Sequence, residues 1–208
     1  MEELLSRYKI TNYMTKRDYI EEVRDYIKDP LHYKDYPRLF MMPDNIMLLN
    51  FNYTQTAGLY HNPNFILNYI HGKLENPDSV IFGYGDELDE DYKKIQSLND
   101  NEYLKNVKSI RYMESDNYRN VLKFIESAPY QICIMGHSCG NSDRTLLNTL
   151  FEHKNCISIK PYYRVKDDGT YNYLELVQNI SRNFTDMKLM RDRVVNKTYC
   201  EPLVKRNV

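Results

Sequence analysis

The stretch QICIMGHSCGNSDRTLLNTL, residues 131–150, decides the predicted fold. Its first part, Gln131 to Met135, is a short and largely apolar run that ends at Gly136. After the polar turn at residues 136–143, apolar side chains recur at helical spacing: Leu146, Leu147, Leu150 and Phe151. This pattern predicts a buried strand, a tight turn and a helix, with a cap from Asn141, Ser142 or Asp143. The first N–H groups of such a helix suit an anion or a reacting oxygen.

Other short apolar runs predict further strands. They cover residues 45–51, 65–70, 79–82, 107–112 and 156–159. Helical patterns cover residues 1–28, 91–108, 117–127, 171–184 and 186–194, with Ser115 as the cap of the third, and three prolines predict a loop over residues 29–44. Because strands alternate with helices, we predict the α/β class with a mostly parallel sheet flanked by helices.

Length and composition predict one domain over residues 1–208. Within it, we expect a helical and loop segment over 1–44, an α/β core over 45–165 and a helical segment over 166–208. The chain has 20 tyrosines and no tryptophan, which an AT-rich coding sequence explains more simply than a base-stacking role does.

Charge and cysteine content argue against several classes of protein. The 28 basic and 29 acidic residues form no basic stripe, so stable nucleic-acid binding is not favoured. The four cysteines match no CxxC zinc pattern, so no metal is expected, and their number suits a reducing cytoplasm. We find neither a signal-peptide pattern nor an apolar run that could span a membrane, so we expect a cytoplasmic protein without a membrane partner.

Three polar turns come directly after predicted strands: residues 51–54 (FNYT), His71–Gly72, and residues 136–140 (GHSCG). Ligands of parallel α/β sheets bind outside the carboxyl ends of the strands, so we expect the three turns to form one site. His71 is there either a general base or a satisfied structural histidine. Asn52 and Thr54 either hydrogen-bond a ribose or amide group, or cap their own turn.

The remaining histidines and acidic residues have simpler readings. His61 and His153 are expected at the surface, and the acidic run over residues 86–91 as a solvated loop. Neither a G-x-G-x-x-G nor a P-loop pattern occurs in the sequence.

The turn at residues 136–140 also matches G-x-S-x-G, the nucleophile elbow of serine hydrolases. A Ser138 nucleophile needs a histidine base, and His153 is the histidine that follows it in the chain. His153 lies about four helical turns away and should not reach Ser138. A serine hydrolase is therefore a minor alternative, beside a purely structural turn whose glycines allow close packing.

Taken together, the turns resemble those of the AbiH family, bacterial abortive-infection proteins that limit phage spread. The resemblance covers about residues 45–163 and rests on FNYT at 51–54, YIHG at 69–72, IFGYG at 81–85 and IMGHSCG at 134–140, followed by Ser142 and Asp143. It implies an anti-phage role, with a phage trigger or a protein partner.

AbiH proteins are in turn distantly similar to sirtuin-like, Rossmann-like domains with three layers, which consume NAD. That similarity implies cleavage of the nicotinamide–ribose bond of NAD or a related nucleotide, which would be a substrate rather than a cofactor. Asn52 and His71 are by this resemblance the catalytic positions, with His71 as base. The candidate nucleotide-binding residues are Thr54, Gly72, Gly136, His137, Ser138 and Asp143.

The chain departs from the family before Asn45. Family members begin with a strand and a GNGFD-like turn, the expected phosphate grip, and the first 44 residues contain no such turn. We therefore expect a truncated, fragmentary or degenerate member. The alternative to a nucleotide enzyme is an inactive interaction module that needs a partner.

Overall fold

The computed structural model describes residues 45–60, 65–85 and 87–204. The predicted helix over residues 1–28, the predicted loop over 29–44 and His61 lie outside these residues. The chain divides into two compact units, Met1–Ile46 and Met47–Val208, and the second contains the three polar turns. The prediction of one domain over residues 1–208 stays a prediction.

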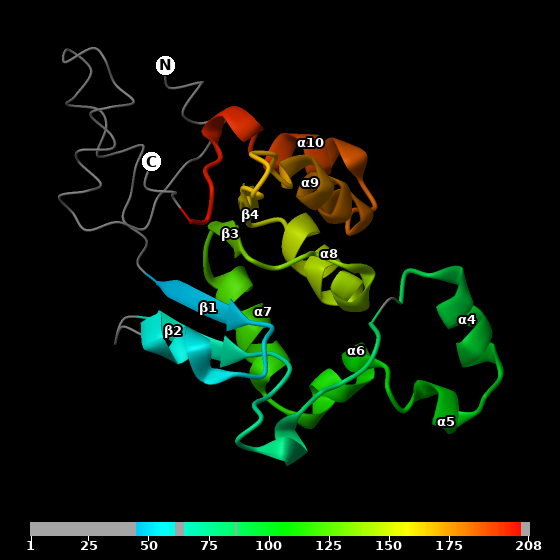
Figure 1. Cartoon of the computed structure of the whole chain (residues 1–208). Helices are drawn as coiled ribbons and strands as arrows, with labels where there is room; N and C mark the ends of the chain where they lie inside the picture. The colour runs from blue at the N-terminus through cyan, green and yellow to red at the C-terminus, as the bar shows by residue number, and fades with distance from the viewer. Residues whose placement is uncertain (1–44, 61–64, 86, 205–208) are drawn as a thin grey trace, which may run out of the picture. The chain divides into compact units, whose positions relative to one another are not determined.

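The strands of the described residues form two sheets of two strands each. Strand β1 (Ile46–Asn50) pairs with β2 (Phe65–Tyr69), and β3 (Tyr130–Met135) pairs with β4 (Cys156–Tyr162). The β3–β4 pair is parallel, with Ile132 opposite Ile159 and Met135 opposite Tyr162. The arrows of β1 and β2 also point in one direction (Figure 1). The four corresponding strand predictions and the α/β class are confirmed, whereas the three-layer arrangement stays a prediction.

Seven α-helices are described. They are α4 (Glu90–Ser97), α5 (Asn101–Leu104), α6 (Lys108–Arg111), α7 (Asn117–Ser127), α8 (Arg144–Glu152), α9 (Tyr173–Arg182) and α10 (Met187–Arg193). Short 3₁₀ turns lie at Gln55–Tyr60, Pro77–Ser79, Tyr112–Glu114, Asn141–Asp143 and Lys197–Tyr199. The helices predicted at α7, α8, α9 and α10 are confirmed. The cap position of α7 is Asp116 rather than the predicted Ser115, although the N–H of Asn117 donates to Ser115 Oγ (3.4 Å).

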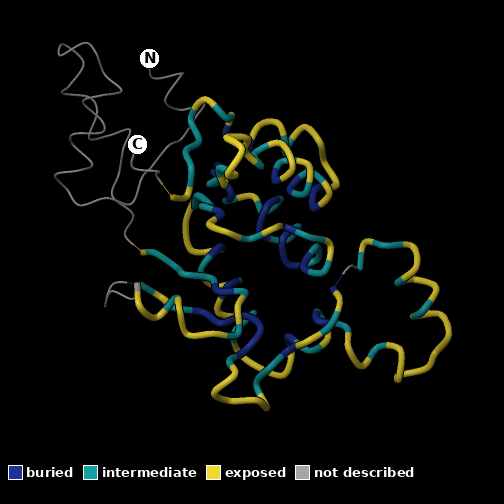
Figure 2. Tube along the Cα trace, in the orientation of Figure 1, coloured by how far each residue is buried: buried dark blue, intermediate teal, exposed yellow. Residues whose placement is uncertain are grey.

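The core lies where helices cover the strands. Helices α8, α9 and α10 contact β4, and α7 contacts β2. The apolar stripe predicted for α8 is buried, and its Phe151 belongs with Ile159 of β4 and Ile180 of α9 to the most deeply buried side chains. Figure 2 shows the buried trace running along these elements, whereas α4 and α5 are mostly exposed. None of the described helices is long and apolar enough to cross a membrane.

Two strand predictions are wrong. The apolar run at 79–82 starts in a 3₁₀ turn and continues without a strand; only Ile81 of its apolar side chains is buried, and its N–H donates to the His71 carbonyl (2.9 Å). In residues 107–112, Val107 forms only an isolated bridge with Tyr84, and the residues from Lys108 form α6 and the start of the next 3₁₀ turn instead of a strand. Lys108 and Tyr112, four residues apart, share the buried side there.

The helix predicted over residues 91–108 is broken in the middle. Asn99 takes a positive φ of 54°, which ends α4, and Asp100 starts α5 by accepting the N–H of Glu102. The acidic run is also more than a solvated loop, because Asp89 caps α4 by accepting the N–H of Asp91. Neither α4 nor α5 has a buried residue, and Figure 1 shows both apart from the strands.

Candidate functional site

The three polar turns meet around the ring of Phe51, the residue that follows β1. The ring centroid of Phe51 lies 5.5 Å from that of His71 and 4.2 Å from that of His137. His71 comes shortly after β2, and His137 shortly after β3. The three turns therefore lie side by side through these aromatic side chains, and their role as one binding site stays a prediction.

The carboxylate of Asp143 connects the two histidines. Lys108 Nζ lies 2.7 Å and His71 Nε2 3.3 Å from Asp143 Oδ1, while His137 Nε2 lies 3.5 Å from Oδ2. Asp143 and Lys108 are 8% and 6% exposed, so this charged pair is almost fully buried. A buried carboxylate of this kind is stable only with partners that replace water.

These contacts determine the charge of Asp143. Burial by itself disfavours the carboxylate, but hydrogen bonds from His137 and Lys108, together with the charge of Lys108, oppose burial, and His71 adds a further hydrogen bond when its Nε2 carries a proton. They hold the pKa of the Asp143 carboxyl well below its usual range. Asp143 is therefore a fixed negative charge between two imidazole rings.

The partners of His71 determine which ring nitrogen carries a proton. His71 Nδ1 lies 3.3 Å from the Phe51 carbonyl oxygen, which can only accept, so Nδ1 is the donor. In the neutral ring, Nε2 then accepts from the hydroxyl of Tyr112, 3.2 Å away. Burial, and next the charge of Asp143, raises the pKa of Tyr112, so its hydroxyl keeps the proton. A second proton on Nε2 would face the Asp143 carboxylate.

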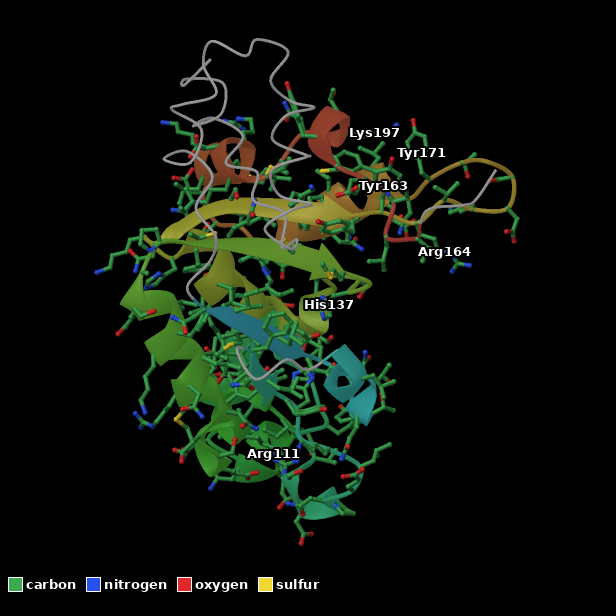
Figure 3. All side chains as sticks on the ribbon, turned by 90° about the vertical axis from the view of Figure 1, so that its left-hand side faces the viewer. Arg111, His137, Tyr163, Arg164, Tyr171 and Lys197 are labelled. Carbon is green, nitrogen blue, oxygen red and sulfur yellow. The ribbon has the colours of Figure 1, made fainter. Side chains whose placement is uncertain are left out.

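His137 is held in the opposite tautomer. Its Nδ1 accepts the backbone N–H of Cys139 (3.0 Å), so Nε2 carries the proton and faces Asp143. The side chain of His137 is 21% exposed and that of His71 is 3% exposed. His137 is therefore the histidine of this network that solvent reaches, and it is labelled in Figure 3.

The turn that carries His137 has an unusual backbone. Gly136 has a φ of 77°, and Cys139 has a φ of 55°, a value that non-glycine residues rarely adopt. Two side-chain amides hold this turn: Asn183, directly after α9, donates through Nδ2 to the Cys139 carbonyl, and Asn179 of α9 donates through Nδ2 to the Ser138 carbonyl, both at 2.9 Å. Burial, and next the charge of Asp143, raises the pKa of the Cys139 thiol to about 12, which favours the neutral thiol over the reactive thiolate.

Asn52, Thr54 and Ser138 are exposed and, within the described part of the chain, lie outside the Asp143 network. The N–H of Asn52 donates to Asn50 Oδ1 (3.0 Å), and the Thr54 hydroxyl pairs with that of Thr56 (3.2 Å). In this structure, contacts with a ribose or amide stay a prediction for both side chains. Gly72 is buried and sets the turn after His71 with a φ of 79°.

The hydrolase alternative gains no support at Ser138. Among the described residues, no histidine hydrogen-bonds to Ser138 Oγ, because both nitrogens of His137 have other partners. His153 stacks against Tyr130, with ring centroids 6.1 Å apart, and is half-buried rather than at the surface as predicted.

The start of α8 also differs from the prediction. Asp143 occupies the cap position, but its side chain does not accept a helix N–H and faces Lys108 and the histidines instead. The N–H of Thr145 in the first turn donates to the Gly85 carbonyl (3.1 Å). One of the N–H groups predicted to bind an anion at the start of this helix is therefore already bonded to a carbonyl of the protein.

Sequence reasoning missed Lys108 and Tyr112. Their four-residue spacing is a helical signal, but the segment was interpreted as a strand, in which the two side chains would also share a face. No group of three metal-binding side chains is found within residues 45–60, 65–85 and 87–204.

Comparison with known proteins identifies the family of the chain. The model of the family described as bacteriophage abortive infection AbiH matches residues 2–164, which is most of the chain and begins earlier than the resemblance noted above. The comparisons with curated proteins and with solved structures give no match. The chain therefore belongs to the AbiH family of bacteriophage abortive infection proteins.

Proposed function

We propose that this AbiH protein acts in the bacterial cytoplasm by binding a nucleotide such as NAD and cleaving its nicotinamide–ribose bond. The observation that carries the proposal is the Asp143 carboxylate, fixed between His71 and His137 at the strand ends. A buried, paired carboxylate beside a histidine is the arrangement that orients general bases in enzymes. The proposal assumes a three-layer, Rossmann-like arrangement of the sheet.

The chemistry assigned to His71 is that of a base. Water attacks the anomeric carbon, the electrons of the carbon–nitrogen bond pass to the nicotinamide ring, and the proton of water goes to His71 Nε2. The Asp143 Oδ1 atom, 3.3 Å away, stabilises the imidazolium that this proton creates. Asn52 and Thr54 contact the ribose, while Gly72, Gly136, His137 and Ser138 line the nucleotide site.

Access to His71 is the demanding part of this proposal. Its side chain is 3% exposed, and Tyr112 occupies Nε2. Water must therefore displace the Tyr112 hydroxyl, or the proton must pass through it. The distances of 3.3 and 3.5 Å to Asp143 are long for tight hydrogen bonds, and such contacts often shorten only when a substrate binds.

The test is nicotinamide release from NAD, followed by NMR with the purified chain. We expect His71→Gln to lower the rate about 10²–10⁴-fold, because an amide keeps hydrogen bonds but accepts no proton. His153→Gln, at the histidine between α8 and β4, is the matched control and should leave the rate unchanged. Equal rates for His71→Gln and the wild type would contradict the role of His71.

The burial of His71 also favours a second candidate, an interaction module that acts through a protein partner or a phage trigger. Each sheet of the described residues has two strands, and the edges of such small sheets can accept a strand from another chain. A folded protein that releases no nicotinamide and captures a partner from infected cells would favour the module. Nicotinamide release by the purified chain alone would exclude it.

A further inference from the structure

A cluster of tyrosine and basic side chains lies at the end of β4, away from the Asp143 network. It consists of Tyr163, Arg164, Tyr171 and Lys197, and we call it the Tyr171 cluster. Figure 3 shows the four residues on the side to which β4 points. The register of β3 and β4 places Met135 opposite Tyr162, so the cluster lies one strand from the Gly136–Gly140 turn. Ligands of parallel sheets bind at this edge.

The backbone of the cluster is a small ordered hairpin. The N–H of Lys166 donates to the Thr170 carbonyl (2.7 Å). The N–H of Asn172 donates to the Arg164 carbonyl (3.1 Å), and the N–H of Arg164 donates to Asn172 Oδ1 (2.7 Å). At the tip, Asp168 accepts both the N–H and the hydroxyl of Thr170, so this carboxylate is used within the hairpin. The tyrosines at its two ends are therefore held in fixed positions.

Three tyrosine rings meet at the base of this hairpin. The ring centroid of Tyr163 lies 5.8 Å from that of Tyr171 and 6.2 Å from that of Tyr173. The hydroxyl of Tyr173 donates to the Val195 carbonyl (2.9 Å), which anchors the group to the core. Tyr171 is 48% exposed, so part of its ring is open to a ligand.

Two cations flank these rings. Lys197 Nζ lies 3.2 Å from the ring centroid of Tyr171, and Arg164 is exposed beside Tyr163. In the described ranges, neither forms an ion pair with a carboxylate, whereas Arg111 pairs with Glu114 (3.0 Å). A guanidinium and an ammonium without acidic partners are suited to bind a phosphate group.

We propose that the Tyr171 cluster binds a nucleoside phosphate. The base stacks on the open part of Tyr171, and the phosphate contacts Arg164 and Lys197. Stacking on tyrosine tolerates any base, because each base has an aromatic face. The chemistry is shared by free nucleotides and by a terminal nucleotide of single-stranded nucleic acid. This site is independent of the catalysis proposed for His71.

The experiment is a binding titration of the full chain with fluorescent N-methylanthraniloyl-AMP, followed by anisotropy. The labelled ligand is displaced by AMP, adenosine, ribose 5-phosphate or a pentathymidylate. We expect AMP to compete better than adenosine and ribose 5-phosphate, because each lacks one of the two contacts. An oligonucleotide that competes at least about tenfold better than AMP identifies nucleic acid as the source, and equal competition identifies free nucleotide.

Variants locate the site. Tyr171→Ala should weaken binding about 5- to 150-fold, the range for loss of one stacked base. Arg164→Ala and Lys197→Met should each weaken it about tenfold and reduce its dependence on salt. Tyr103→Ala, at an exposed tyrosine on α5, and Arg111→Ala are matched controls without effect.

Two results would overturn the inference. One is the absence of binding by the folded protein to any of the competing ligands. The other is binding that His71→Gln abolishes while Tyr171→Ala and Arg164→Ala leave it unchanged, because the ligand would then occupy the Asp143 site. A wild-type protein that binds AMP at the Tyr171 cluster but releases no nicotinamide from NAD would disprove the proposed catalysis and leave the Tyr171 cluster supported.

Discussion

The same contact occurs in two regions of this molecule with opposite surroundings. Lys108 Nζ lies 2.7 Å from Asp143 Oδ1 between the polar turns, and Lys94 Nζ lies 2.7 Å from Asp91 Oδ1 on α4. The side chains of the first pair are 8% and 10% exposed, and those of the second 76% and 75%. Distance alone would rank the two ion pairs as equal.

Burial makes them different. Water solvates Lys94 and Asp91 whether or not they meet, so their contact adds little to stability. Asp143 has lost its water, and each partner that is removed leaves a charge that nothing replaces. The comparison teaches that the turns around Asp143 depend on one another, whereas α4 carries its ion pairs on an open surface. Three experiments test this difference.

The largest effect is expected from Lys108→Met. This variant leaves the Asp143 carboxylate without its closest partner, and we expect the free energy of unfolding to fall by about 3–5 kcal/mol. Urea denaturation measures it, with Lys94→Met as the matched control that leaves the midpoint unchanged. The double variant Lys108→Met, Asp143→Asn should recover part of the loss, because it removes the uncompensated charge. Equal midpoints for the two single variants would refute the comparison.

A smaller effect is expected from the side-chain amides of Asn179 and Asn183, at the C-terminal end of α9. Asn183 is fully buried and Asn179 is not, although both donate to the 138–139 turn at 2.9 Å. Asn183→Ala leaves the Cys139 carbonyl unsatisfied inside the protein and should cost about 1–3 kcal/mol in urea denaturation. Asn179→Ala exposes the Ser138 carbonyl to water and should cost less. A larger loss for Asn179→Ala would show that burial does not set the strength of these contacts.

The smallest effect is expected in how steeply the free energy of unfolding depends on pH. Because the folded-state pKa of Asp143 lies below the value of about 3.9 for an unfolded chain, its contribution is present above that pH and is lost as the pH falls. Stability curves of the wild type between about pH 5 and 2 should be steeper than those of Asp143→Asn by at most about 1.4 kcal/mol per pH unit. Asp91→Asn should leave the slope nearly unchanged, since Asp91 is solvated. Parallel curves for Asp143→Asn and the wild type would contradict the assignment.

The sequence predicted those parts of the fold in which one pattern dominates. The apolar runs that became β1, β2, β3 and β4 have the length of strands and end at polar turns, and the apolar stripe of α8 is buried at helical spacing. The strand predicted at 79–82 does not form; this run buries a single apolar side chain, Ile81, and Phe82 is 74% exposed. The strand prediction for residues 107–112 is wrong because the apolar pattern of six residues does not distinguish a strand from a short helix.

The residues of the candidate site were predicted only where their position next to a strand or a helix start is visible in the local sequence. His71, His137 and Asp143 follow strands or begin a helix, and their position in the chain placed them near one edge. Lys108 comes from a segment whose structure was wrongly assigned, and its contact with Asp143 spans 35 residues. No local pattern encodes that contact, because it depends on how the starts of α6 and α8 lie against each other. The catalytic roles of His71 and Asn52 stay predictions.

The glycine after His71 has a consequence for the comparison of sequences. A Cβ atom at Gly72 would lie 2.0 Å from the backbone oxygen of Ser79, and the φ of 79° is itself unfavourable for other residues. Any chain that keeps this crossing of two backbones must keep glycine here, whether or not it retains an activity. A histidine–glycine pair in a related protein therefore reports a shared turn, and only assays of the histidine can report shared chemistry.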